Sequence, residues 1–119
     1  MLPYKNRLIK RTDFEKVYKY GRLFYFENVA VKIIKNGLDE SRIGFSVGIK
    51  FSKKAVERNR TKRQLREIFR KMLAKIEKGA DIVVMMKKIE KGRNEPKKLA
   101  IFVEGALEKG NLINNNCKN

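Results

Sequence analysis

Hydrophobic and polar residues follow two different periods along this chain, and the changes of period mark its predicted elements. The clearest strand pattern is a strict alternation from residue 43 to residue 49. An alternation of period two places successive side chains on opposite faces of a strand. The apolar face carries Ile43, Phe45, Val47 and Ile49, and the opposite face carries Gly44, Ser46 and Gly48. We therefore predict that the apolar face packs on a helix and that the small-residue face leaves the backbone accessible.

A helix is predicted ahead of this strand. Thr12 and Glu15 have the spacing of a capping box, in which each residue satisfies a free backbone amide of the first turn. Gly21 is interpreted as a left-handed terminator of the same helix. Residues 22–35 are rich in aromatic and β-branched residues, which predicts extended structure, and Asn36-Gly37 predicts a turn.

The second half of the chain predicts a long helix, a buried strand and a last helix. The long helix begins at Ser52 or Lys53 and is terminated by Gly79, and residues 81–86 form a continuous apolar run typical of a central strand. The last helix begins near Pro96 and ends at Gly110, and residues 111–119 are expected to be mobile. Residues 1–119 are interpreted as a single domain, and the order of elements indicates an α+β sandwich.

The long helix has one apolar stripe when it is drawn at 100° per residue. The stripe consists of Leu65, Ile68, Phe69, Met72, Leu73 and Ile76. Continued toward the N-terminus, the same stripe meets Arg58 and Lys62. The front half of the helix is therefore expected to project past the core and to carry cations where packing requires aliphatic residues.

Charge makes this helix the most informative part of the chain. The formal net charge is +17 over 119 residues, and the segment from Lys50 to Lys71 holds ten Lys or Arg residues against two acids. A solvated helix face is the ordinary interpretation of a charge run, but such a face pairs its cations with acids at i,i+4, and only Glu57 and Glu67 are present here. A fixed cation array with excess Arg favours binding to phosphates. We therefore predict a nucleic-acid partner.

Missing residue types exclude several classes of chemistry. The chain contains no His, so a Ser-His-Asp triad is excluded, and the usual general base near neutral pH is absent. Its single Cys117 can form neither an internal disulfide framework nor a zinc site. Asp39-Glu40 is interpreted as a solvated acidic turn. Because there is no long apolar run and no signal peptide, we expect a cytoplasmic location.

Two aromatic residues have alternative interpretations. Phe14 and Tyr18 lie four residues apart on the first predicted helix, so their rings share a face. They either line a cleft that binds single-stranded nucleic acid or belong to the core. The glycines of the 43–49 strand have a similar pair of interpretations, which are close approach of a ligand and close packing of a helix.

At this point the sequence resembles the bacterial ribonuclease P protein component. The resemblance rests on "AVERNRTKRQLRE" followed by "IFR", with "RTDFEKVYKYG", "RIGFSVGIK" and "GADIVVMMK" elsewhere in the chain. It implies an α+β sandwich with a left-handed crossover from the 43–49 strand through the long helix to the 82–86 strand. It also implies assembly with a catalytic RNA, whose bound Mg²⁺ hydrolyses precursor tRNA at the 5′ leader. No residue of the protein is expected to be catalytic or to bind metal.

The resemblance and the charge pattern together give two sets of candidate residues. The set expected to contact the RNA subunit is Lys50, Lys53, Lys54, Arg58, Asn59, Arg60, Lys62, Arg63, Arg66 and Arg70. The set expected to line the leader cleft is Phe14, Tyr18, Lys32, Ser46, Gly48 and Lys50. Lys32 stands where some family members have an aromatic residue, so an ionic leader contact is expected there. The alternative function is that of a non-catalytic structural RNA-binding protein such as a ribosomal protein, and a membrane-surface protein is disfavoured.

Overall fold

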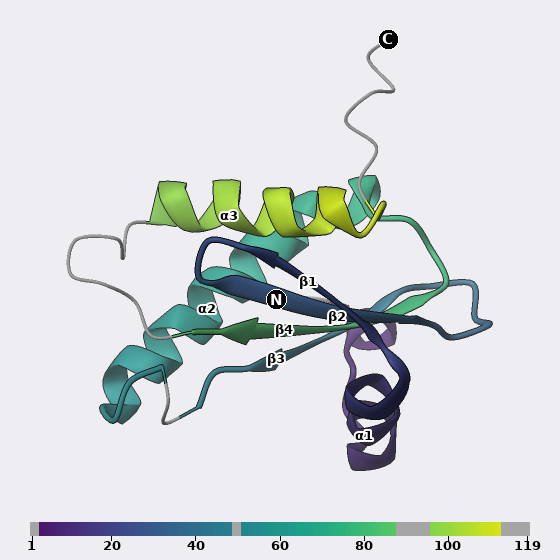
Figure 1. The fold of residues 1–119 in the computed structure, drawn as a ribbon, viewed down its shortest axis with the longest axis horizontal. Helices are drawn as coiled ribbons and strands as arrows, with labels where there is room; N and C mark the ends of the chain where they lie inside the picture. The colour runs from purple at the N-terminus through teal and green to yellow at the C-terminus, as the bar shows by residue number, and fades with distance from the viewer. Residues whose placement is uncertain (1–2, 49–50, 88–95, 113–119) are drawn as a thin grey trace, which may run out of the picture.

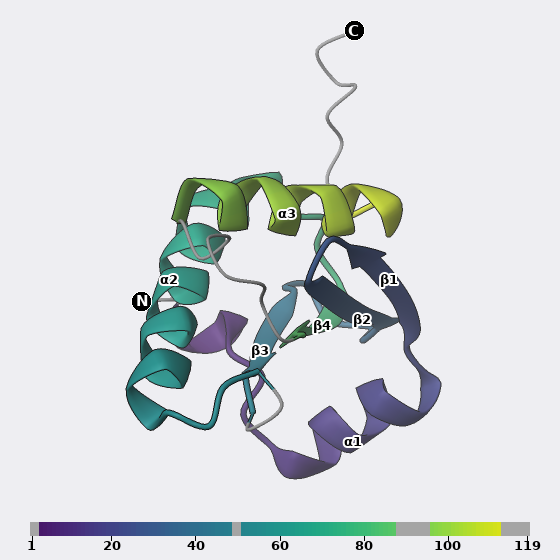
Figure 2. The same cartoon turned by 60° about the vertical axis from the view of Figure 1, so that its left-hand side comes forward.

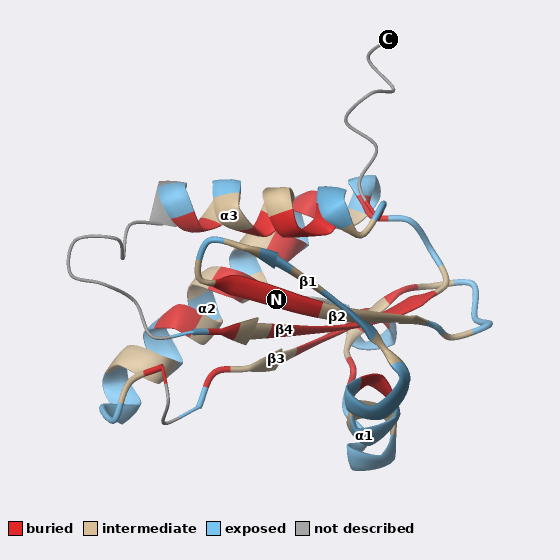
Figure 3. Cartoon of the chain, viewed as in Figure 1, coloured by how far each residue is buried: buried red, intermediate tan, exposed pale blue. Residues whose placement is uncertain are grey.

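Four strands form one mixed sheet in the computed structural model, which describes residues 3–48, 51–87 and 96–112 (Figure 1). Across the sheet the order is β1 (Arg22–Phe26), β2 (Val29–Lys35), β4 (Ala80–Met86) and β3 (Arg42–Ser46). The β1–β2 and β2–β4 pairs are antiparallel, whereas β3 runs parallel to β4. The apolar run predicted as a central strand is therefore central, as its burial on both faces requires, and Figure 3 shows β4 mostly in the colour of buried residues.

Three α-helices cover this sheet: α1 (Arg11–Tyr20), α2 (Ala55–Met72) and α3 (Pro96–Lys109), with short 3₁₀ turns at Tyr4–Asn6 and Leu73–Lys75. The α2 and α3 helices share the main core with one face of the sheet, where Phe69 of α2 meets Phe45 and Phe102 of α3 meets Phe26. The opposite face packs on α1 through a smaller cluster around Val17 and Val83. Figure 2 shows α1 and α3 on opposite sides of the sheet.

The predicted α+β class, the mixed sheet and the core stripe of the long helix are confirmed. Leu65, Phe69 and Met72 are buried, and Ile76 remains buried beyond the helix. The connection from β3 through α2 to β4 joins parallel neighbouring strands, as the resemblance implied. Its left-handed sense stays a prediction.

The helix α1 does end at Tyr20, before Gly21 as predicted, but the predicted caps at its two ends were wrong. No side chain caps the helix at Lys10, and the first turn closes on the Lys10 carbonyl, which accepts from the Asp13 and Phe14 amides. Glu15 pairs with Arg11 at 3.4 Å instead of reaching back to a free amide. Gly21 follows the helix with φ −72°, so it is not left-handed.

The predicted ends of α2 were also wrong. The helix begins at Ala55 because the Ser52 hydroxyl accepts from the Lys54 amide ahead of the first turn, at 3.1 Å. It ends at Met72, well before Gly79, and a 3₁₀ turn then directs the chain back so that Ile76 enters the core. Gly79 does adopt a positive φ of 90°, but it does so in the turn that enters β4.

Two further differences concern turns. Residues 22–35 form a hairpin, because Glu27 adopts φ 54° and reverses the chain between β1 and β2. After α3, which ends at Lys109 before Gly110 as predicted, the residue with positive φ is Asn111. Leu112, in the tail that was expected to be mobile, is buried, and its carbonyl accepts from the Glu77 amide at 2.8 Å. The rest of that tail, together with Ile49 and Lys50, lies outside the described residues.

Candidate nucleic-acid interface

The basic helix α2 surrounds a narrow buried stripe with cations. The stripe continues toward the N-terminus through Thr61, which is only 1% exposed and which the sequence pattern did not reveal. Arg58 and Lys62 flank Thr61 and are half-buried. The first turn does project from the core as predicted, since Val56 is 68% exposed. The predicted cations therefore lie on a helix that the sheet holds along one side only.

The candidate RNA-contacting residues divide by exposure. Lys53, Lys54, Asn59, Arg60, Arg63 and Arg70 are exposed, whereas Arg58, Lys62 and Arg66 are half-buried. Arg58 donates to the Ser52 carbonyl at 2.9 Å, which joins the helix to the loop before it. Arg70 donates to Glu67, and this hydrogen bond raises the pKa of Arg70 and lowers the pKa of Glu67. Arg70 is therefore already paired with a carboxylate of its own helix.

The helix α1 presents an aromatic pair over the other face of the sheet. The Phe14 and Tyr18 ring centroids lie 6.4 Å apart, as their i,i+4 spacing predicted. Phe14 is half-buried and packs with Leu8 and Val83, whereas Tyr18 is 39% exposed. Gly44 lies directly beneath the Phe14 ring, and a Cβ at that position would overlap the ring. Phe14 thus packs in the smaller cluster without being fully buried, and its role as cleft lining or as core stays a prediction.

Lys32 supports the aromatic pair from the sheet. Its Nζ donates to the Tyr18 carbonyl at 2.7 Å and lies 5.9 Å from the Tyr18 ring centroid. Lysine donors near a helix C-terminus satisfy its free carbonyls. The side chain expected to make an ionic leader contact is therefore engaged with the end of α1.

Beyond α1, one row of aligned residues crosses all four strands of the sheet. Strand pairing aligns Tyr25, Ala30, Met85 and Ser46 side by side across the four strands. At the β3 end Ser46 is half-buried and Gly48 is exposed, with no atom within 4 Å of a Cβ built on Gly48. At the β1 end Tyr25 is 42% exposed, with the Lys87 Nζ 4.0 Å from its ring centroid. An aromatic ring and a cation therefore lie at the far end of a row of smaller side chains.

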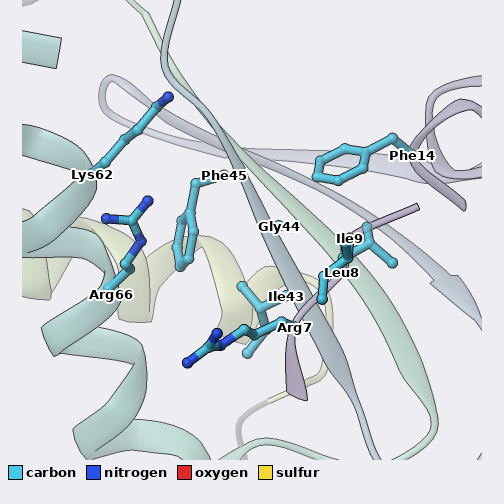
Figure 4. A pocket seen from close by; sticks show the side chains of 9 residues that line it. All are labelled: Arg7, Leu8, Ile9, Phe14, Ile43, Gly44, Phe45, Lys62 and Arg66. Carbon is cyan, nitrogen blue, oxygen red and sulfur yellow. The ribbon is translucent and has the colours of Figure 1, made fainter. Parts of the chain in front are cut away.

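A cavity of about 360 Å³ lies between Phe14 of α1 and the basic helix α2. Figure 4 shows Lys62 and Arg66 of α2 on one side and Phe14 of α1 on the other, with Gly44 and Phe45 of β3 between them. The N-terminal segment closes the cavity, since the Leu8 amide donates to the Ile43 carbonyl at 3.0 Å. Candidate residues from the two predicted sets thus line one space.

A buried ionic cluster fixes α1 on the sheet beside this cavity. Arg42 donates to both carboxylate oxygens of Asp81, at 2.8 and 2.7 Å, and to Asp13 of α1 at 3.2 Å. The hydrogen bonding of Arg42 to the Asp81 carboxylate is the largest of the effects that raise the pKa of Arg42. Asn36 also donates to Asp81 at 2.9 Å. Because Asp13 precedes Phe14, this cluster positions the ring as well as the helix.

Several residues that shape the site were missed by sequence reasoning. Arg7 lines the cavity, and the Lys87 ammonium lies over the Tyr25 ring at the β1 end of the row that crosses the sheet. The available signal for Tyr25 was its alternation with Phe24 and Phe26, which pack toward α3 and leave Tyr25 on the opposite face.

The carboxylates of the described residues do not converge on a metal site. No group of three or more His, Cys, Asp or Glu side chains meets there, and the closest acidic pair, Asp13 and Asp81, is occupied by Arg42. Within the same residues, no helix combines the length and apolar character needed to cross a bilayer.

Comparisons with known proteins agree on one family. The sequence model of the Ribonuclease P family matches residues 2–109. The chain is 38% identical to a ribonuclease P protein component from Pseudanabaena over 117 residues, which covers 98% of this chain and 100% of that protein. The fold is similar to a ribonuclease P protein structure from Thermotoga maritima, with TM-score 0.78 and 39% identity over 87% of this chain and 96% of that one. It is also similar to one from Staphylococcus aureus, with TM-score 0.81 and 29% identity over 92% and 98%.

Proposed function

Because this chain belongs to the family of bacterial ribonuclease P protein components, we propose that α2 binds the RNA subunit and that the α1 face of the sheet holds the 5′ leader of precursor tRNA. The family supplies the protein subunit of ribonuclease P, an endoribonuclease that works as a ribonucleoprotein. The protein's part is binding and positioning, and its net charge of +17 suits a polyanionic partner.

The RNA subunit contacts the exposed side of α2 in this proposal. Arg60 and Arg63 present guanidinium groups that match phosphate oxygens two at a time. Asn59 lies exposed between arginines, where its amide can donate to or accept from a base or sugar edge. Arg70 contributes less, because Glu67 already partners it.

The leader follows the cavity and then the row of residues that crosses the sheet from Ser46 of β3 to Tyr25 of β1. Phe14 and Tyr18 offer ring faces and edges for stacking, which holds single strands without reading their sequence. Ser46 and the open backbone at Gly48 allow close approach, and Tyr25 with Lys87 ends the row. Lys32 acts indirectly by holding the C-terminal end of α1.

The single observation that carries this proposal is that Phe14, Lys62 and Arg66 line the same cavity. A nucleotide whose base lies against Phe14 has its phosphate within reach of cations from α2, so leader and RNA subunit meet on adjacent surfaces. A structural RNA-binding protein with no substrate requires no such junction. Copurification separates the two functions: one RNA of several hundred nucleotides supports this proposal, and whole ribosomal subunits support the alternative.

The decisive experiment compares two substrates in the assembled holoenzyme. Phe14→Leu should weaken binding of precursor tRNA by about five- to 150-fold, because stacking on an aromatic ring contributes about 1–3 kcal/mol per base. Binding of mature tRNA, which has no leader, should be nearly unchanged. Phe26→Leu is the matched control, since Phe26 packs on α3 from the opposite face. Equal losses for both substrates would reject the leader assignment.

The metal ion belongs to the RNA in this proposal. Ribonuclease P is metal-dependent, and we infer that the ion is Mg²⁺ held mainly by RNA phosphates, because Mg²⁺ prefers oxygen ligands and keeps several waters. The donor set argues in the same direction, since Asp13 and Asp81 are already paired with Arg42. No chemical step is therefore assigned to a protein side chain.

A further inference from the structure

A second groove, of about 630 Å³, lies where α2 faces α3. It is on the side of α2 away from the cavity that holds Phe14, because Lys62 and Arg66 line that cavity whereas Arg60 and Lys71 line this groove. Figure 2 shows α2 and α3 meeting far from α1. The groove is thus separate from the proposed leader path.

The interior of the groove combines apolar walls with one unsatisfied acceptor. Ile68 and Met72 of α2 and Ala100 of α3 supply the apolar lining. The side chain of Gln64 also lines the groove, and its Oε1 atom is buried without a hydrogen-bond partner, so a ligand in the groove reaches this acceptor only when the amide group rotates. A buried amide oxygen without a donor is unfavourable in the free protein, so this position suits a ligand that brings an N–H group.

The rim of the groove selects for an anionic ligand. It carries four cations against two carboxylates, and one of those carboxylates, Glu67, is already paired with Arg70 and Lys71. A flat ligand with apolar faces, an N–H edge and an attached phosphate fits the apolar walls, the unsatisfied acceptor of Gln64 and the cationic rim. Nucleotides have these properties, and every base carries at least one N–H donor on its edge.

We propose that this groove binds one unstacked nucleotide of the RNA subunit. The base lies between Ile68, Met72 and Ala100, the amide group of Gln64 rotates toward it, and the N–H edge of the base donates to Gln64 Oε1. The phosphates on either side contact the guanidinium groups of Arg60 and Arg63. This assignment rests on the proposed contact between α2 and the RNA subunit, and it adds a base-binding site to a contact otherwise made with phosphates.

A neutral plug tests the site without changing charge. Ala100→Phe fills the groove, whereas Ile101→Phe adds a ring at the neighbouring position, which is 61% exposed and does not line the groove. The probe is the ribonuclease P RNA transcribed from the genome that encodes this chain. Ala100→Phe should weaken assembly by tenfold or more without changing the salt dependence, and Ile101→Phe should leave assembly unchanged. Equal affinities for the two variants would overturn the proposal.

Gln64→Met separates a base contact from a structural role, because the two roles predict different changes in protein stability and in RNA affinity. The variant keeps the side-chain length and removes the unsatisfied oxygen, so the melting temperature of the free protein should stay the same or rise. Assembly affinity should nevertheless fall by about fivefold or more, and one base of the RNA subunit should lose its protection from chemical probing. Unchanged affinity and an unchanged probing pattern would mean that water alone satisfies Gln64, and the site would be rejected.

These outcomes distinguish this site from the proposed function itself. If assembly with the unmodified protein depends steeply on salt but Ala100→Phe has no effect, the phosphate contacts of α2 stand and the groove is not a base site. If assembly shows no salt dependence, the proposed contact between α2 and the RNA subunit is rejected, and the groove proposal is rejected with it.

Discussion

Gly44 and Phe14 form the most testable contact in the molecule. A Cβ added at residue 44 would overlap the far edge of the Phe14 ring and would lie 3.2 Å from the Leu8 Cβ. Overpacking at a well-packed site costs about 1–3 kcal/mol, so Gly44→Ala should destabilise the protein by about 2 kcal/mol. Gly48→Ala is the matched control, because its Cβ would meet nothing within 4 Å. It should change the free energy of unfolding by less than about 1 kcal/mol.

A double-mutant cycle attributes this cost to the ring. Phe14→Leu alone should cost about 1 kcal/mol, because it keeps most of the apolar volume. In the Phe14→Leu background, Gly44→Ala should cost only about half as much, since the overlapping ring atoms are gone while the Leu8 contact remains. Coupling energies between contacting residues range over about 0.5–3 kcal/mol. Urea unfolding of the four proteins measures the cycle, and an equal cost of Gly44→Ala in both backgrounds would refute the packing argument.

The same substitution also reports on function. Gly44→Ala retains the Phe14 ring but displaces it, so a holoenzyme with this variant should bind precursor tRNA about fivefold or more weakly, which corresponds to about 1 kcal/mol of stacking. Binding of mature tRNA should stay the same. If leader discrimination were intact while stability fell, Phe14 would be a packing residue only, and the leader path would lie elsewhere on the sheet.

Three further outcomes are expected. The log of the assembly constant should fall with log salt by about 0.7–0.9 per phosphate contact, and Arg63→Ala should flatten the slope by about one contact. Arg11→Ala, a control cation on α1 already paired with Glu15, should leave the slope unchanged. Nuclease-free protein without RNA should not cleave precursor tRNA at any Mg²⁺ concentration, and correct cleavage by protein alone would contradict the assignment of chemistry to RNA. Arg42→Met should cost about 3 kcal/mol in urea unfolding, because Asp81 stays buried after losing both N–H donors of Arg42, and a loss below about 1 kcal/mol would show that the cluster contributes little.

Periodicity predicted the parts of the fold that local burial determines. The apolar stripe of α2 and the central position of β4 follow from which residues must leave water, and both were confirmed. Helix ends were less predictable because tertiary partners compete for the same groups. Asp13 illustrates this competition, since its carboxylate accepts from Arg42, a residue 29 positions away.

The candidate site shows the same division. Charge and spacing identified the cations of α2 and the aromatic pair of α1, but they did not show that Lys62 and Phe14 line one cavity. That proximity depends on β3 lying between α2 and α1, which is a property of strand order. Lys32 was placed in the leader cleft from the family resemblance, and its hydrogen bond to the Tyr18 carbonyl, 14 positions away, could not be predicted from local spacing. The hairpin at Glu27 was missed because its turn lacks glycine and proline.

The strand order also determines when the chain can fold. The β1 and β2 strands are neighbours in sequence and can pair as soon as both exist, whereas β3 must wait for β4, its only strand partner within the described residues. Parallel pairing across an intervening helix is a non-local contact, which slows folding. The cationic α2 is therefore synthesised before the strand that fixes its orientation. During translation, an RNA that captures the completed helix shifts folding toward the native state by mass action, so assembly of the ribonucleoprotein and folding of its protein become one coupled equilibrium.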